Sequence, residues 1–351
     1  MGTGAGVEAS TDGGASADVE TSADVGAFSF QLDDSELAAS VRAGLVDVER
    51  LLRDAVASDV ELIATAALHL VNAGGKRIRP LFTLLAAQFG DPHKSDVITA
   101  AAAVELVHVA TLCHDDVMDE ATMRRGVVSA NARWDNTVAI LTGDYLFAQA
   151  SRLVSDLGTD AARIIAETFS ELVAGQMRET VGPADGDDRV AHYLSVIGQK
   201  TGSLIATAGR FGGMCSGAQA EHVDALRGYG SLIGAAFQIS DDIIDIASPS
   251  TESGKTPGTD LREGVHTLPM LYALEDSTTD RLAELLAEPL TSDELVDEAL
   301  DLLRESKGLA RARDTLAEYA RRACDELAQL PPLPARDALI SLTDYVVART
   351  N

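Results

Sequence analysis

Two acidic pentapeptides stand out because each lies in an otherwise apolar stretch of the chain. The first is DDVMD at residues 115–119, and the second is DDIID at residues 241–245. Side chains four residues apart on a helix project from one face, so each copy would present its aspartates together. Two like charges about 4 Å apart repel by roughly 4 kcal/mol at an effective dielectric constant of ~20. Such a group of carboxylates needs cations, and an all-oxygen ligand set favours Mg²⁺.

Basic side chains are concentrated beside these acidic motifs. The segment GGKRIRP at residues 74–80 places three cations after a glycine turn and at the start of a helix. Backbone N–H groups and the helix dipole also favour an anion there. Arg124 and Arg125 follow the first acidic motif, and Lys255 follows the second. Each of these basic residues, taken alone, is equally well explained as a solvated surface charge. Guanidinium groups, however, suit the bidentate contacts that a diphosphate offers.

Four more polar residues lie on the helices that would surround such a site. Lys200 and Thr201 interrupt an apolar helix, and Gln238 precedes the second acidic motif by three residues. His108 lies seven residues, about two turns, before the first acidic motif. Lys200 could equally be an ordinary surface lysine, and His108 could equally be a hydrogen-bonded core histidine.

The elements that must position these side chains are helices. From about Asp34 onward, Leu, Ala, Ile and Val recur at three- and four-residue spacing, and no strand is expected. The expected helices cover residues 35–57, 60–73, 78–90, 95–119, 130–157, 160–182, 189–210, 220–247, 266–276, 279–287, 293–305, 309–329 and 334–349. Helices 95–119 and 220–247 are apolar over most of their circumference, which predicts central, buried helices. Each carries an acidic motif near its C-terminal end, where the helix dipole disfavours anions, so bound metal is again favoured.

The composition predicts one domain, residues 31–351, behind a disordered acidic tail, residues 1–30. The tail lacks the basic start and apolar core of a signal peptide. Apolar runs elsewhere are expected to stay shorter than the ~18 residues of a membrane span. Three widely spaced cysteines show neither a disulfide framework nor zinc-type spacing. These features predict a soluble, cytoplasmic protein, and the net charge of -27 argues against nucleic acid as a partner.

The ordered series of motifs resembles the trans-isoprenyl diphosphate synthase family, and within it the all-trans polyprenyl diphosphate synthases. The likeness runs from about Asp34 to the C-terminus and includes GGKRIRP at 74–80, HDDVMDEATMRRG at 114–126, GDYL at 143–146, GQMRE at 175–179, KTGSLI at 200–205, FQISDDIID at 237–245 and GKTPGTDLREG at 254–264. The sequence of these motifs, together with GVHTLPMLYAL at 264–274, is most similar to that of actinobacterial members that make long menaquinone side chains. The resemblance implies an all-α, antiparallel helical bundle around a deep central cavity, the isoprenoid synthase fold, and normally a homodimer.

The same resemblance implies a role for each matched residue. Two to three Mg²⁺ ions are expected, held by Asp115 and Asp119 with support from Asp116, and from the other side by Asp241, with Asp242 and Asp245 nearby. Isopentenyl diphosphate would be bound by Lys76, Arg79, His108 and Arg125, and Arg77 beside them is assigned to substrate binding as well. The allylic diphosphate would be bound by Arg124, Lys200 and Lys255, and the reacting centre would be lined by Thr201 and Gln238, which with Lys200 form the expected catalytic set.

One departure from the family pattern lies after the DLREG segment. Many members have a lysine there, whereas this chain has Val265 followed by His266. The change removes one diphosphate contact or shifts it to His266. Because the members that look most similar also read GVHTLP, we interpret it as a subfamily trait.

The expected reaction is the Mg²⁺-dependent, successive 1'-4 condensation of isopentenyl diphosphate onto an allylic diphosphate primer. Cations stabilise the departing diphosphate, and an apolar cavity excludes water from the allylic cation. Where short-chain members carry a bulky aromatic floor before the first acidic motif, this chain has the small residues Ala110 and Thr111, with Val107 on the same flank. A long all-trans product is therefore expected, and these three positions are expected to help set its length. Release of the product is expected to involve transient contact with the membrane.

Three alternatives remain at this level. A short-chain, geranylgeranyl-type synthase would share every motif. A class I terpene cyclase or head-to-head prenyl synthase is disfavoured by the second Asp-rich motif and by the GGKR turn, which serves a second diphosphate. A regulatory subunit of a heteromeric synthase is disfavoured because both acidic motifs are intact.

Overall fold

A computed structural model describes residues 34–248, 257–276 and 280–350. The tail at residues 1–30 and Lys255 lie outside this part of the chain, so the predictions made for them stay predictions. The helices are α1 Ser35–Ala55, α2 Glu61–Asn72, α3 Ile78–Ala87, α4 Ser95–Met118, α5 Ala130–Arg133, α6 Asn136–Asp156, α7 Thr159–Val181, α8 Arg189–Ile197, α9 Ser203–Ser216, α10 Ala220–Ala247, α11 Thr259–Glu263, α12 Leu268–Asp276, α13 Asp280–Leu285, α14 Asp293–Glu305, α15 Lys307–Leu327 and α16 Pro334–Ala348. The predicted all-α fold is confirmed.

Helices α1 and α6 each begin at an aspartate that caps their first turn. Asp34 accepts a hydrogen bond from the backbone N–H of Leu37 at 2.7 Å, and Asp135 accepts one from Val138 at 2.8 Å. These contacts satisfy N–H groups that have no partner inside the first turns of α1 and α6.

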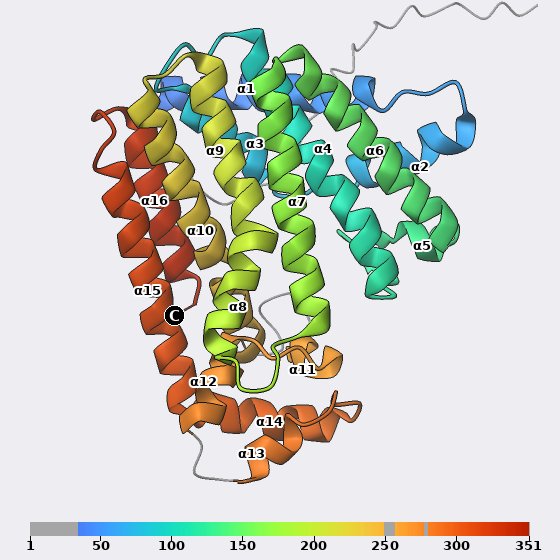
Figure 1. Cartoon of the computed structure of the whole chain (residues 1–351), viewed down its shortest axis with the longest axis vertical. Helices are drawn as coiled ribbons and strands as arrows, with labels where there is room; N and C mark the ends of the chain where they lie inside the picture. The colour runs from blue at the N-terminus through green and yellow to red at the C-terminus, as the bar shows by residue number, and fades with distance from the viewer. Residues whose placement is uncertain (1–33, 249–256, 277–279, 351) are drawn as a thin grey trace, which may run out of the picture.

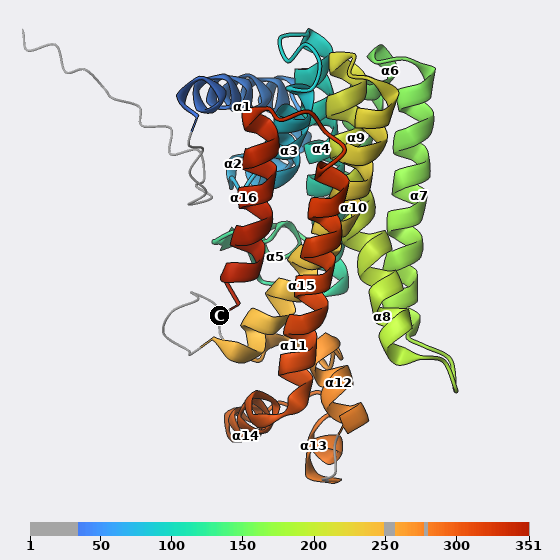
Figure 2. The same cartoon turned by 90° about the vertical axis from the view of Figure 1, so that its left-hand side faces the viewer.

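The long helices form a bundle around α4 and α10. Figure 1 shows α7, α9, α10, α15 and α16 running along the long axis, with α1 across one end and α12 to α14 at the other. The view in Figure 2 places α15 and α16 on the opposite side of α10 from α7. Most residues of α4 between Val97 and Cys113 are buried, and the apolar residues of α10 are buried against α9 and α15. The prediction of two central, buried helices is confirmed.

The local course of the chain differs from the prediction in four places, one of which is the short helix α11 Thr259–Glu263, where no helix was expected. The helix expected at 189–210 is divided into α8 and α9 by a π-helical turn, η1 Gly198–Gly202. The helix expected at 130–157 is divided into α5 and α6. The expectation of no strand was wrong, because β1 Met123–Arg124 pairs antiparallel with β2 Val127–Val128. The turn residues Arg125 and Gly126 both have positive φ, at 53° and 76°, which is the geometry of a tight hairpin turn.

Helix α4 also corrects the expectation about apolar runs. By length and composition it is apolar enough to cross a membrane, although 67% of its most apolar window is buried inside the protein. Its apolar circumference is thus accounted for by neighbouring helices, as in the core helix of a soluble bundle.

Candidate active site

Two adjoining cavities bring the predicted site residues together. The first has a volume of about 660 Å³, and its lining includes Lys76, Arg77, Arg79, His108, Thr111, Asp115, Arg125, Lys200, Thr201, Gln238 and Asp241. The second, of about 590 Å³, is lined by Asp119 and Asp242 and shares Lys200 and Gln238 with the first. Segments from α3, α4, α9 and α10, and from the hairpin, therefore converge on one region although they lie far apart in the sequence.

The first acidic motif occupies the C-terminal end of α4. Burial raises the pKa of Asp115 to about 6, despite the nearby positive charge of Lys200. Asp116 is fully buried; its Oδ1 accepts a hydrogen bond from Arg124 Nε at 2.5 Å, while its Oδ2 has no hydrogen-bond partner. Asp119 is half exposed and lies 3.8 Å from Arg124 Nη2. Arg124 is thus held by the motif itself.

The second acidic motif, on α10, is held by three different kinds of contact. Asp241 Oδ1 accepts a hydrogen bond from Arg349 Nη2 at 2.6 Å. Asp242 is buried and accepts hydrogen bonds from the Tyr193 hydroxyl and from Gln238 Nε2, the latter at 3.0 Å. Burial raises the pKa of Asp242 to about 7 even with these two donors. Asp245 accepts from the backbone N–H groups that open α11.

These carboxylates fit a divalent cation. The orphaned Oδ2 of Asp116 and the raised pKa values of Asp115 and Asp242 indicate acidic groups with too little compensating charge. Among the residues that the structure describes, no three His, Cys, Asp or Glu side chains form a ready-made metal cage. Carboxylate oxygens are ligands that hard divalent cations such as Mg²⁺ and Ca²⁺ accept, with waters and substrate phosphates completing the shell.

The basic side of the first cavity is built around the glycine turn. Burial lowers the pKa of Arg79 to about 10, and burial together with the charges of Arg79 and Arg125 lowers the pKa of His108 well below its usual value. His108 is therefore neutral at physiological pH. Lys76 Nζ lies 5.7 Å from the centre of the Phe237 ring, and both residues line the first cavity. A cluster of cations and one neutral imidazole can thus receive an anion with several oxygens.

Arg77 differs from its neighbours because its guanidinium is already occupied. It donates to Glu49 at 2.5 Å, to Glu105 at 2.7 Å and to the carbonyl oxygen of Val71 at 2.8 Å. Its side chain is 3% exposed, so few of its atoms reach the cavity. The assignment of Arg77 to substrate binding stays a prediction, while the contacts show that it ties the glycine turn to α1 and α4.

The predicted reacting centre lies at the π-helical turn. Lys200 donates a hydrogen bond to Glu179 of α7, and Thr201 Oγ1 donates to Gln238 Oε1 at 3.3 Å. A π turn inserts an extra residue into a helix and frequently marks a functional site. Here it lies between α8 and α9 and carries Lys200 and Thr201, both of which line the first cavity.

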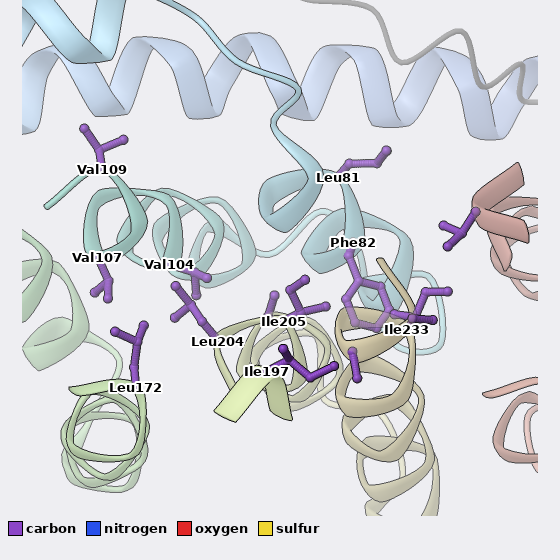
Figure 3. Close-up of a cluster of buried hydrophobic side chains, with 14 of the residues drawn as sticks. Leu81, Phe82, Val104, Val107, Val109, Leu172, Ile197, Leu204, Ile205 and Ile233 are labelled. Atoms are coloured by element: carbon purple, nitrogen blue, oxygen red, sulfur yellow. The ribbon is translucent and has the colours of Figure 1, made fainter. Parts of the chain in front are cut away.

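The three predicted chain-length residues are placed differently from one another. Thr111 lines the first cavity, as do Leu172 of α7 and Leu204 of α9. Val107 is buried and points toward Leu172 (Figure 3). Ala110 is buried and is not among the residues that line the cavity. The 100° step between helical residues puts Ala110 well round the helix from Asp115, whereas Thr111 stays on its face.

Several residues of the site carried no assigned role in the sequence interpretation. They are Glu105, Leu172, Glu179, Tyr193 and Arg349. Only Glu179 had a signal, since it closes the GQMRE segment, while the others meet the motifs through contacts distant in sequence. His266 lines the second cavity, but its Nε2 is hydrogen-bonded to the Leu286 carbonyl oxygen at 2.7 Å, so that nitrogen is already engaged.

Comparison with known proteins supplies independent information. The sequence model of the polyprenyl synthetase family matches residues 60–303. Over 321 residues the chain is 58% identical to the nonaprenyl diphosphate synthase of Mycobacterium tuberculosis, covering 91% of this chain and 96% of that protein. It is 48% identical to a dimethylallyltranstransferase of the same organism over 320 residues, covering 90% and 97%. A crystal structure of geranylgeranyl pyrophosphate synthase from Corynebacterium glutamicum, complexed with calcium and isoprenyl diphosphate, is 50% identical with a TM-score of 0.83, covering 92% of this chain and 99% of that one.

Proposed function

The chain belongs to the polyprenyl synthetase family, and from this premise we propose that it is a prenyltransferase that builds a long all-trans polyprenyl diphosphate. It would add isopentenyl diphosphate repeatedly to an allylic diphosphate primer. The observation that carries the proposal is the convergence of two acidic motifs and a separate basic cluster on adjoining cavities. Two diphosphates need two such subsites.

The basic cluster is the proposed subsite for isopentenyl diphosphate. Lys76, Arg79 and Arg125 would neutralise its diphosphate, and neutral His108 would contribute a hydrogen bond without adding charge. Arg125 is presented by the hairpin turn and donates to the Gly74 carbonyl oxygen, so it closes over the glycine turn. The double bond of the bound molecule would then face the apolar part of the cavity.

The acidic motifs are the proposed subsite for the allylic diphosphate and its metal ions. Asp115, Asp119 and Asp241 would hold the ions, which we propose to be two or three Mg²⁺. Bound Mg²⁺ would stabilise the negative charge that develops on the departing diphosphate. Lys200, with Arg124, would hold further oxygens of that diphosphate. Thr201 and Gln238 would keep the allylic carbon in line with the double bond.

A long product is supported by the side chains at the apolar end of the first cavity. Leu172 and Leu204 line that cavity, and Figure 3 shows Val104 and Val107 of α4 in the buried cluster beside them. All four are aliphatic, and none is the bulky aromatic residue that serves as the floor in short-chain members. The 58% identity to a nonaprenyl diphosphate synthase points the same way.

We further propose that the protein is a cytoplasmic homodimer whose product supplies the side chain of menaquinone. It would contact the membrane during product release. Exposed apolar side chains on α2, the hairpin and α6 support a second copy as their partner, namely Leu62, Met123, Val128, Ile140 and Leu141. Light scattering on the purified protein tests the dimer, and a monomer at micromolar concentration would contradict it.

The function is tested by incubating the purified protein with Mg²⁺, labelled isopentenyl diphosphate and primers of different length. Chromatography of the products should show a ladder that ends well beyond four isoprene units. A ladder that ends at four units would leave a geranylgeranyl-type synthase as the answer. If no elongation occurs with any primer, the proposal of a synthase active without a second subunit is wrong. Asp337→Asn is the matched control for Asp115→Asn, because Asp337 lies on α16 and lines neither cavity.

A further inference from the structure

Glu105 is a fully buried acidic side chain inside the basic cluster. It lies on α4, 1% exposed, three residues before His108. Its Oε1 accepts a hydrogen bond from Arg77 Nη1 at 2.7 Å and lies 3.6 Å from Arg125 Nη2. A buried carboxylate is costly unless it is paired, so these contacts must be maintained for α4 to carry it.

The charges around Glu105 show what it does for its neighbours. After burial, Glu105 is the largest influence on the pKa of Arg77, Arg79 and Arg125 alike, and in each case it favours the charged form. The arginines act in the opposite direction on one another, because Arg125 disfavours the charge on Arg79 and Arg77 disfavours the charge on Arg125. Glu105 therefore offsets repulsion within the cluster.

The backbone makes this support necessary. Arg77 and Arg125 both have a left-handed conformation, with φ of 48° and 53°, so neither is held by a regular helix or strand at its own position. Arg125 lies in the turn between two strands of two residues each. Besides Glu105, the Gly74 carbonyl oxygen is the acceptor that holds its guanidinium. The direction in which Arg125 points is thus set jointly by this hydrogen bond and by its ion pair with Glu105.

We propose that Glu105 is a positioning residue that aims Arg125 at the isopentenyl diphosphate subsite. It rests on the proposed function, since it assumes that this cluster binds that substrate. Removal of the Glu105 charge has two opposite consequences for a bound diphosphate. It takes away a nearby negative charge, which alone would tighten binding, and it frees the arginines, which would weaken binding. The geometry points to weakening, because charge-assisted contacts require donors held in place.

The test compares Glu105→Gln with Glu49→Gln. Glu49 pairs with the same Arg77 through Nε at 2.5 Å, and in the described part of the chain neither a hydrogen bond nor an ion pair joins it to Arg125, so it controls for the loss of an arginine ion pair. Calorimetry with isopentenyl diphosphate in the absence of primer measures binding without reaction, and steady-state kinetics measures KM for each substrate. Glu105→Gln should raise the dissociation constant and KM for isopentenyl diphosphate at least tenfold, with KM for the primer changed less than threefold. Glu49→Gln should change all of these less than threefold.

These measurements test the proposed function and the positioning role of Glu105 separately. If the wild-type protein neither binds isopentenyl diphosphate nor elongates a primer, the proposed function fails. If the wild type does both, and Glu105→Gln binds isopentenyl diphosphate equally or more tightly, the positioning role is wrong. If Glu105→Gln does not fold, Glu105→Asp keeps the charge but withdraws the carboxylate by one methylene, and it should weaken binding at least threefold. Unchanged binding by a folded Glu105→Asp would overturn the proposal.

Discussion

Replacement of Asp242 by Asn should stabilise the metal-free protein above neutral pH. Asp242 is buried in α10, and its pKa is raised from 3.8 to about 7, first because of burial. The folded state therefore holds a proton on this carboxyl between pH 4 and 7 where the unfolded state does not. Stability falls as the pH rises through that range, and the full penalty is present above pH 7.

The size of the effect follows from the same two values. At 1.36 kcal/mol per pH unit, an elevation from 3.8 to about 7 corresponds to roughly 4 kcal/mol at pH 8. Asn removes the charge but keeps one acceptor and adds a donor, so Tyr193 and Gln238 can still hydrogen-bond to it. For a domain of about 320 residues, with an unfolding entropy near 2.1 cal/mol/K per residue, the gain amounts to a Tm increase of about 6 °C at most.

Calorimetric melting in EDTA from pH 4 to 8 measures this difference. The gain of Asp242→Asn over the wild type should be near zero at pH 4, grow through pH 6 and level off above pH 7. Asp245→Asn is the matched control, because Asp245 accepts backbone N–H groups of Thr259 and Asp260 and the amide would lose an acceptor. That variant should be destabilised. An Asp242→Asn protein that melts lower than the wild type at pH 8 would refute the reasoning.

Three further predictions concern product length, packing and metal. Thr111→Phe should shorten the product ladder more than Ala110→Phe, because only Thr111 lines the cavity; equal shortening by both would contradict this. Gly212→Ala should lower the free energy of unfolding by about 2 kcal/mol or more, since its Cβ would lie 2.3 Å from the Thr83 carbonyl oxygen, and Gly198→Ala, with open space around it, is the control that should melt like the wild type. The Mg²⁺ concentration for half-maximal activity should rise as the pH falls below about 6, where Asp115 is protonated, and a requirement that stays constant from pH 8 to 5.5 would count against Asp115 as a ligand.

The elements were predictable because their signals are local. Apolar spacing identified the long helices, and the all-round apolar character of α4 and α10 identified the central pair. The hairpin was not predicted, because two strands of two residues each show no detectable periodicity. The π turn was not predicted either, because a single inserted residue within a helical pattern leaves the surrounding spacing nearly unchanged.

The site was predictable as a set of motifs and not as a set of contacts. Spacing alone indicated that the aspartates of each pentapeptide share a helix face. It contained no sign that Arg349 reaches Asp241 over 108 positions, or that Tyr193 reaches Asp242 over 49. Nor did it distinguish Arg77, which is enclosed by Glu49 and Glu105, from Arg79 two residues later.

The sequence by itself determined the fold class, the family and the chemical character of the site, because helical periodicity and acidic or basic motifs are properties of short segments. Tertiary structure alone decided which of those side chains are committed to protein contacts and which line a cavity. Ala110 and Thr111 are neighbours in the chain, yet only Thr111 lines the first cavity. The physical reason is that burial, charge compensation and the direction of a side chain depend on what packs against it, and those neighbours come from distant helices.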